Sequence, residues 1–153
     1  MISARCELRL AGVHPDLVRV VRRAAEGGAT FRVTEGLRTR ERQAELVAKG
    51  ASQTMNSRHL TGHAVDLAPL VDGEVSWDWK HFFPLADAAA DAARKEGVPL
   101  IWGGAWARTV QDWPQSRAKQ AQDAYVAERR AVGRKPFLDG PHFELPVAVY
   151  PAG

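Results

Sequence analysis

The sequence predicts a small α+β domain in which helices pack on a mostly antiparallel sheet. A chain of 153 residues with 45% hydrophobic content supports one ordinary core but is too short for two domains of usual size. Apolar residues recur at helical spacing in some segments and alternate with polar residues in others, so both helices and strands are expected. The single cysteine, Cys6, excludes a disulfide scaffold and a Cys-rich zinc motif.

Charge and hydropathy narrow the choice of partners. A formal charge of +3 favours approach to an anionic surface, whether nucleic acid, membrane or cell wall. The arginines are scattered without a recognised nucleic-acid-binding motif, so we expect no nucleic-acid partner. No run approaches the roughly 20 apolar residues that span a bilayer, and the N-terminus lacks an apolar signal segment. We therefore expect a monomer without stable membrane insertion, made in the cytoplasm without a signal peptide.

The first third of the chain predicts a helix, a strand and a second helix. "FRVTEGLR" alternates apolar and polar residues as a half-buried strand does. Thr39 can cap the helix "RERQAELVAK", which stops at Gly50, so Arg38 is expected at a strand-to-helix junction. The earlier helix follows "HPD", ends at Gly27-Gly28 and carries apolar residues at helical spacing: Leu17, Val20, Val21 and Ala24.

The remaining segments predict three strands and two helices. "ASQTMNSRHLTG" indicates a loop, and "HAVDLAPL" a half-buried strand followed by a turn at Asp72-Gly73. "PLADAAADAARKEG" predicts a helix that opens at Pro84 and ends at Gly97, and "VPLIWGG" suits an internal strand. "SRAKQAQDAYVAERRAVG" predicts a surface helix, and the proline-flanked "GPHFELPVAVY" a strand near the sheet edge.

The stretch "SRHLTGHAVDL" offers a candidate metal pair, His59 and Asp66. Zinc binds imidazole nitrogen and carboxylate oxygen at about 2.0–2.2 Å. The two residues are seven apart, unlike ligands on one helix, but Gly62 lets the backbone fold back between them. His63 competes, yet alternation along the strand places it on the face opposite Asp66. The alternative is a loop histidine and a turn-capping aspartate without metal.

The late stretch "FLDGPHFEL" adds His142 as a third candidate ligand. Three protein ligands leave a fourth position for water, whose pKa zinc lowers to about 7. A nearby carboxylate can take the proton of that water as it attacks a carbonyl, which describes a metallohydrolase. Glu144 shares a strand face with His142, and Asp139 lies on the turn before Gly140-Pro141, so spacing leaves both open as the base.

Three ordered motifs resemble those of the zinc peptidoglycan peptidases, a family with D-alanyl-D-alanine carboxypeptidases and L-alanyl-D-glutamate endopeptidases. "SRHLTGHAVDL" is similar to the family's Ser-x-His and Gly-x-Ala-x-Asp signature, and "DGPHFEL" to its second metal motif. "EGLRTRERQAEL" resembles the segment that precedes both. With "WGGAW" as a weaker landmark, the likeness covers about Thr34 to Leu145 and is closest to phage endolysins of the endopeptidase type.

The resemblance implies a role for each matching residue. Asp139 would be the catalytic base, Gln43 and Ser57 would line the substrate cleft, and Arg38 would hold the oxyanion. A fixed guanidinium aimed at developing negative charge can supply several kcal/mol, although Arg38 could instead belong to a solvated basic cluster. The ligands of one zinc ion at the sheet face would be His59, Asp66 and His142.

The resemblance also implies the reaction. One zinc peptidase domain over residues 1–153 would hydrolyse peptidoglycan stem peptides at the L-alanyl-D-glutamate bond and lyse cells after release to the cell wall. Cleavage of D-alanyl-D-alanine is the alternative. A zinc-bearing wall-binding module without hydrolysis is a second alternative, and the presence of Asp139 argues against it.

The sequence departs from the family pattern after "WGG". Ala105 stands where an aspartate is common, and the segment at about 107–136 is longer than expected, either a helical insertion over the cleft or a surface excursion. Trp113, beside Pro114, is the one tryptophan expected to contact a partner. Core or cleft-wall positions are expected for the other four: Trp77, Trp79, Trp102 and Trp106.

Overall fold

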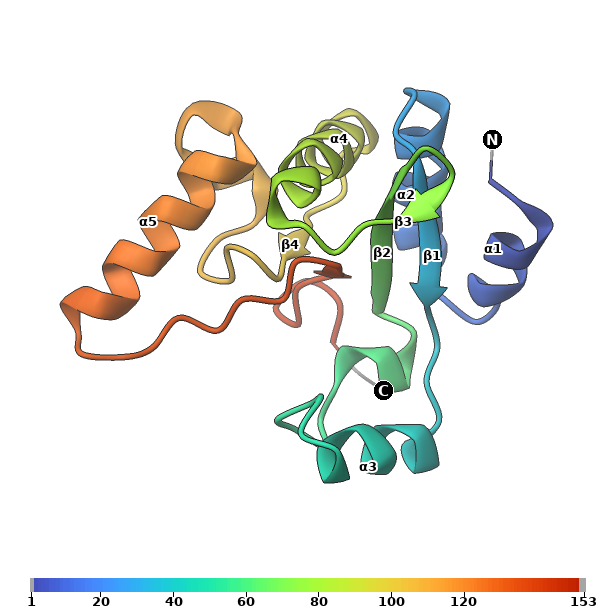
Figure 1. The fold of residues 1–153 in the computed structure, drawn as a ribbon, viewed down its shortest axis with the longest axis horizontal. Helices are drawn as coiled ribbons and strands as arrows, with labels where there is room; N and C mark the ends of the chain where they lie inside the picture. The colour runs from blue at the N-terminus through green and yellow to red at the C-terminus, as the bar shows by residue number, and fades with distance from the viewer. Residues whose placement is uncertain (1, 152–153) are drawn as a thin grey trace.

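A five-stranded antiparallel sheet forms the centre of the computed structural model, which describes residues 2–151 (Figure 1). This arrangement confirms the predicted α+β class. The strands are β1 (Phe31–Glu35), β2 (Ala64–Val71), β3 (Glu74–Val75), β4 (Ile101–Trp102) and β5 (His142–Glu144). The helices are α1 (Ala4–Arg9), α2 (Pro15–Glu26), α3 (Arg40–Ala48), α4 (Trp79–Glu96) and α5 (Ala118–Ala131), with short 3-10 turns η1 (Arg58–Thr61), η2 (Val110–Asp112) and η3 (Pro114–Ser116).

The strand order is β1-β2-β5-β4, with β3 paired to β2, and every pair is antiparallel. The predicted places of the last two strands were therefore wrong, since β5 is internal and β4 lies at the edge. Pro141 and Pro146 flank β5 just outside its bounds, so its own amides remain free to bond on both sides. Although β4 is an edge strand, its Trp102 is fully buried. Phe83 of α4 and Trp113, between η2 and η3, pack against the Trp102 ring, which explains why the strand is apolar.

Helices α2 and α4 pack against each other, and α4 also contacts β2. The apolar stripe predicted for α2 is buried as expected. Helix α4 begins at Trp79, with Asp78 capping it, and not at Pro84 as predicted. Packing of Trp79 and Phe83 against Trp102 favours a helix that begins before Pro84, although the proline removes one backbone hydrogen bond and its ring crowds the carbonyl of Lys80. No helix within residues 2–151 is long and apolar enough to cross a membrane.

Two short elements had no clear sequence signal. Helix α1 is one and a half turns long and is capped by Ser3, and its Cys6 sulfur accepts a hydrogen bond from Val33 N at 3.3 Å. The turn η1 lies inside the segment predicted as a loop, and Ser57 caps it. Elements of four to six residues are too short for hydrophobic periodicity to reveal them.

The segment at 107–136 contains η2, η3 and α5, and α5 forms one side of the molecule in Figure 1. Asp87 of α4 accepts a hydrogen bond at 2.7 Å from the backbone N–H of Ala118, the first residue of α5. Trp113 is only 5% exposed and packs 5.8 Å from Trp102, so its predicted role in partner contact was wrong. Trp77 is 64% exposed and not in the core or cleft wall as expected.

Replacing Trp113 should therefore destabilise the fold. Trp113→Ala removes a buried ring and is expected to lower the free energy of unfolding by about 3–5 kcal/mol. Trp77→Ala is the matched control and should change it by less than about 0.5 kcal/mol. Urea unfolding followed by far-UV circular dichroism measures both, and equal stabilities of the two variants would contradict the buried position of Trp113.

Candidate active site

The pairing of β1, β2 and β5 determines which side chains lie together at the base of the site. Asp66 on β2 lies directly opposite His142 on β5, so the two side chains share one face of the sheet. On the other side of β2, a register shift after Val33 places Glu35 opposite Asp66. Glu35, Asp66 and His142 thus form a row across three adjacent strands.

His59 joins this row from η1. Its backbone carbonyl accepts from Arg38 N at 2.9 Å, and its ring is almost completely buried. Gly62 ends η1 with φ 76°, and a Cβ there would lie 2.3 Å from the carbonyl oxygen of Gly12. Only glycine fits this turn, which returns the chain from His59 into β2.

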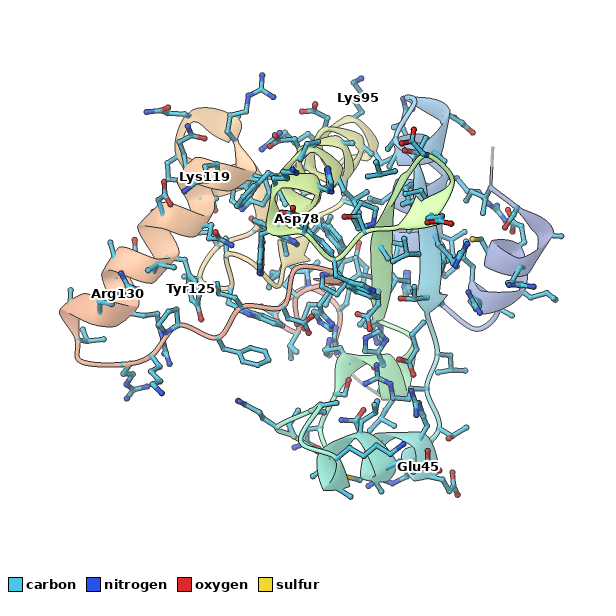
Figure 2. The ribbon with its side chains drawn as sticks, in the orientation of Figure 1. Glu45, Asp78, Lys95, Lys119, Tyr125 and Arg130 are labelled. Carbon is cyan, nitrogen blue, oxygen red and sulfur yellow. The ribbon has the colours of Figure 1, made fainter. Side chains whose placement is uncertain are left out.

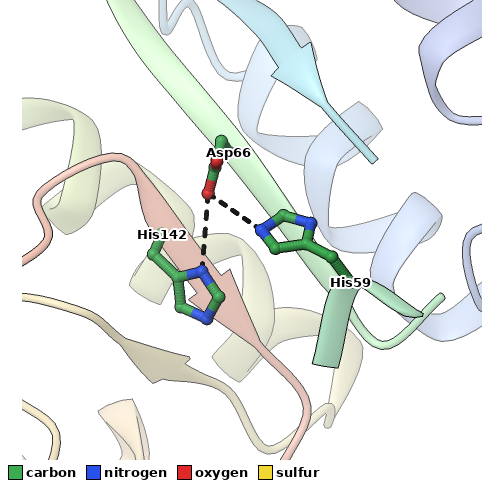
Figure 3. Close-up of side chains that lie close together, drawn as sticks. All are labelled: His59, Asp66 and His142. Carbon is green, nitrogen blue, oxygen red and sulfur yellow. Dashed lines mark hydrogen bonds and ion pairs between the residues drawn. The ribbon is translucent and has the colours of Figure 1, made fainter. Parts of the chain in front are cut away.

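The two histidines and Asp66 converge, as Figure 3 shows. Asp66 Oδ1 lies 3.2 Å from His59 Nε2 and 3.4 Å from His142 Nδ1. The opposite nitrogens have acceptors of their own: His59 Nδ1 lies 2.8 Å from Gly36 O and His142 Nε2 lies 2.8 Å from Glu144 Oε1. When those nitrogens carry the protons, both lone pairs point at the carboxylate, an arrangement that a bound cation would stabilise.

The donor set and its spacing fit a metal ion. Tetrahedral zinc with bonds of about 2.0–2.2 Å separates its ligand atoms by about 3.3–3.6 Å, close to the two observed distances. Burial lowers the pKa of His142, but hydrogen bonds to Asp66 and Glu144 outweigh it and raise the value to about 9. Burial raises the pKa of Asp66, yet its bonds to the two histidines hold it well below the usual range. His59, Asp66 and His142 could therefore bind a metal ion.

Asp139 stands beside this group at the start of a tight turn. Its backbone N–H donates to Gly103 O at 2.8 Å, and its carbonyl accepts from His142 N at 3.1 Å. A Cβ at position 103 would lie 2.2 Å from Asp139 O, so the approach requires glycine. Burial, and then the charge of Asp66, raise the pKa of the Asp139 carboxyl, although His142, His59 and Arg38 oppose the shift.

The two carboxylates that the sequence left open as the base occupy different surroundings. Glu144 is engaged with the His142 ring, where it holds the orientation and tautomer of that imidazole. The Asp139 carboxylate lines the cleft and has no hydrogen-bond partner among the described side chains. It is the carboxylate free to exchange a proton with a bound molecule.

Arg38 is buried behind Asp66 and held by three side chains. Its Nε and Nη2 donate to the two oxygens of Glu35, each at 2.8 Å, and its Nη1 donates to Gln43 Oε1 at 2.7 Å. Arg38 Nη2 also lies 3.6 Å from Asp66 Oδ2. This burial excludes the solvated basic cluster that the sequence left as an alternative for Arg38.

Gln43 lies behind the cleft and not on its wall. The side chain is fully buried, accepts from Arg38, and donates through Nε2 to Ser52 Oγ at 2.8 Å and to the carbonyl of Thr54. Direct substrate contact, expected for Gln43, does not match this position. Ser57 does line the cleft, where its hydroxyl accepts from His59 N.

The site opens into a cleft of about 790 Å³. One wall comes from α3, η1 and the loop between them, and the other comes from Trp106, α5 and the segment before β5. Tyr125 and Arg129 place α5 on the cleft, so the long segment is part of the wall. The sequence analysis did not identify Tyr125, Arg129 or Glu35 as cleft residues. The sequence does not show where α5 packs, and a single carboxylate on a strand has no motif that would mark it as part of a site. His63 lies outside the metal group, as alternation predicted.

These features define an α+β domain whose buried His–Asp–His group, at the base of an open cleft, could hold a catalytic metal. The model of the phage L-alanyl-D-glutamate peptidase family matches residues 1–146. The chain belongs to this family and is a hydrolytic enzyme of that class.

Individual relatives agree with this assignment. The L-alanyl-D-glutamate peptidase of Escherichia phage T5 is 35% identical over 105 residues, which are 65% of this chain and 77% of that protein. The L-alanyl-D-glutamate peptidase of Listeria phage A118 is 33% identical over 85 residues, 56% of this chain but only 29% of that protein. The crystal structure of Serratia marcescens L-Ala D-Glu endopeptidase ChiX is 41% identical with a TM-score of 0.72, covering 99% of this chain and 93% of that one.

Zinc binding at pH 7.5 should release about one proton. The pKa of His142 is about 9 in the metal-free site, so the imidazole is protonated at this pH and must lose its proton to bind. Calorimetric titration of metal-free protein in buffers of different ionisation enthalpy measures the release, which should fade as the pH rises through 9. His63→Ala should behave as wild type, and binding without proton release would contradict the stated geometry.

Proposed function

We propose that the chain is a zinc peptidase that cleaves the L-alanyl-D-glutamate bond of peptidoglycan stem peptides at the cell wall. The observation that carries the proposal is the convergence of His59, Asp66 and His142 in a chain of the L-alanyl-D-glutamate peptidase family. The donor atoms would be His59 Nε2, Asp66 Oδ1 and His142 Nδ1. The single domain over residues 1–153 and the monomeric state stay predictions.

Zinc held by these ligands would supply Lewis acidity and an activated water to the scissile carbonyl. The protein orients the ligands itself, because Gly36 O fixes the His59 ring and Glu144 fixes the His142 ring. This support keeps both imidazoles aimed at one point before a substrate arrives.

Asp139 would act as the general base and then as the general acid. Its carboxylate takes a proton from the attacking water and passes that proton to the leaving amine. The raised pKa of Asp139 favours the exchange, since a base with a pKa nearer neutrality also returns the proton readily. Glu144 is less suited because the His142 ring occupies it.

Arg38 would stabilise the oxyanion as the carbonyl carbon becomes tetrahedral. Contacts with Glu35 and Gln43 fix the guanidinium without any reorganisation during the reaction. The Nη2 side of the Arg38 guanidinium still faces Asp66 and the cleft, where the oxyanion would form. In this scheme Gln43 is a positioning residue for Arg38.

The proposed bond specificity and metal can be tested on purified muropeptides. Wild-type protein should release fragments that begin with D-glutamate, detected by mass spectrometry. A chelator should abolish the release and added zinc should restore it. Free D-alanine as the sole product would favour the carboxypeptidase alternative, and stable zinc binding without any product would favour the non-catalytic module.

Asp139→Asn should retain zinc but lose activity. We expect kcat to fall about 100- to 10,000-fold, because the amide cannot accept the proton of the attacking water. Zinc content by atomic absorption and peptide release are measured on the same samples. Asp123→Asn, an exposed carboxylate on α5, is the control and should keep full activity. Near-normal turnover by the Asp139 variant would transfer the role to another group.

A further inference from the structure

The proposed substrate brings a negative charge close to the reacting bond. A glutamyl residue has two carboxyl groups, and only one of them can form the amide that continues the chain. The residue on the amine side of an L-alanyl-D-glutamate bond therefore carries a second carboxyl, free and anionic unless it is amidated. A cleft specific for this residue should offer a cation to that carboxylate.

Three arginines line the cleft, and two of them are already engaged. Arg38 is bound to both oxygens of Glu35 and to Gln43. Arg58 donates from Nε and Nη2 to the carbonyl of Leu145, and from Nη2 to that of Tyr150 at 2.7 Å. Its remaining nitrogen is sealed from solvent, so Arg58 is not available to a ligand. The one edge of Arg38 that faces the cleft is the edge proposed for the oxyanion.

Arg129 is the available cation. It is half-buried on α5, and its Nε donates to Lys135 O at 3.1 Å, which directs the side chain along the cleft wall. Its two terminal nitrogens have no hydrogen-bond or ion-pair partner within residues 2–151. They can form the paired hydrogen bonds that a carboxylate accepts from a guanidinium.

The position of Arg129 matches the side of the cleft where the leaving amine belongs. Arg38 approaches the metal group from the junction of β1 and α3, on the opposite wall from α5. Asp139, which would protonate the amine, lies in the segment that connects α5 to β5, and both Asp139 and Arg129 line the cleft. The glutamyl residue should thus extend from the reacting bond toward α5.

We propose that Arg129 binds the free carboxylate of the D-glutamyl residue and sets the preference for substrates that carry it. The assignment rests on the proposed function. Arg129 follows Tyr125 by four residues, so both lie on one face of α5, the helix on which Figure 2 labels Tyr125 and Arg130. Arg130 is exposed and absent from the cleft lining, which makes it a matched control.

The test compares two peptides that differ at this one group: L-alanyl-D-glutamyl peptide with the free carboxyl, and the same peptide with that carboxyl amidated. Wild type, Arg129→Ala and Arg130→Ala are assayed for kcat/KM on each. Calorimetry adds the affinity of metal-free protein for the product that begins with D-glutamate. Melting temperatures check that both variants fold.

For Arg129→Ala we expect kcat/KM on the free acid to fall about 10- to 100-fold, with little change on the amide. Wild type and Arg130→Ala should both keep the preference for the acid, and product affinity should fall only in Arg129→Ala. Equal losses on both peptides would indicate a shift of the 134–138 segment and overturn the assignment, as would no loss. If wild type cleaves neither peptide, the proposed function itself fails and the assignment falls with it.

Discussion

The site depends on one pairing register, that of β2 with β5. This register sets Asp66 opposite His142, and β5 has only three residues with which to hold it. Backbone hydrogen bonds beyond the strand fix it further, from Leu67 N to Pro141 O and from Leu145 N to His63 O, each 2.9 Å. Because side chains alternate along a strand, a shift of this pairing register by one residue would place His142 on the opposite face of the sheet from Asp66. The three candidate metal ligands would then no longer lie together.

Two turns without room for a side chain bring the remaining groups to this pair. Gly62 lets η1 return to β2 and so delivers His59, while Gly103 lets the chain before β5 approach closely and so delivers Asp139. The backbone carbonyl of Gly36 then orients His59, as Glu144 orients His142. The reactive side chains are held by backbone geometry on a sheet, which limits their movement far more than a mobile loop would.

Sequence patterns predicted what is local and missed what depends on contacts between distant segments. Thr39 and Gly50 mark the ends of α3 because capping is chemistry within one turn. The predictions that β4 is internal and that β5 lies near the sheet edge were wrong, because two apolar strands look alike until their neighbours are known. The buried Trp113 and the wall position of α5 likewise follow from packing across the chain, as does the burial of Gln43 under Arg38. The metal group was predictable because its motif residues are specific, whereas spacing alone did not show which of Asp139 and Glu144 stays free.

The charges of the site explain why it could hold a cation. Four carboxylates, from Glu35, Asp66, Asp139 and Glu144, line the cleft, and Arg38 pairs with only the first two, at 2.8 Å and 3.6 Å. Burial, and then the charge of Asp66, raise the pKa of Asp139, and the pKa of His142 is raised, against the effect of burial, by its bonds to Asp66 and Glu144. A divalent ion among the ligands would relieve the repulsion and displace the proton from His142. Metal binding should therefore contribute to folding as well as to chemistry, because the unfolded chain has no such cluster to relieve.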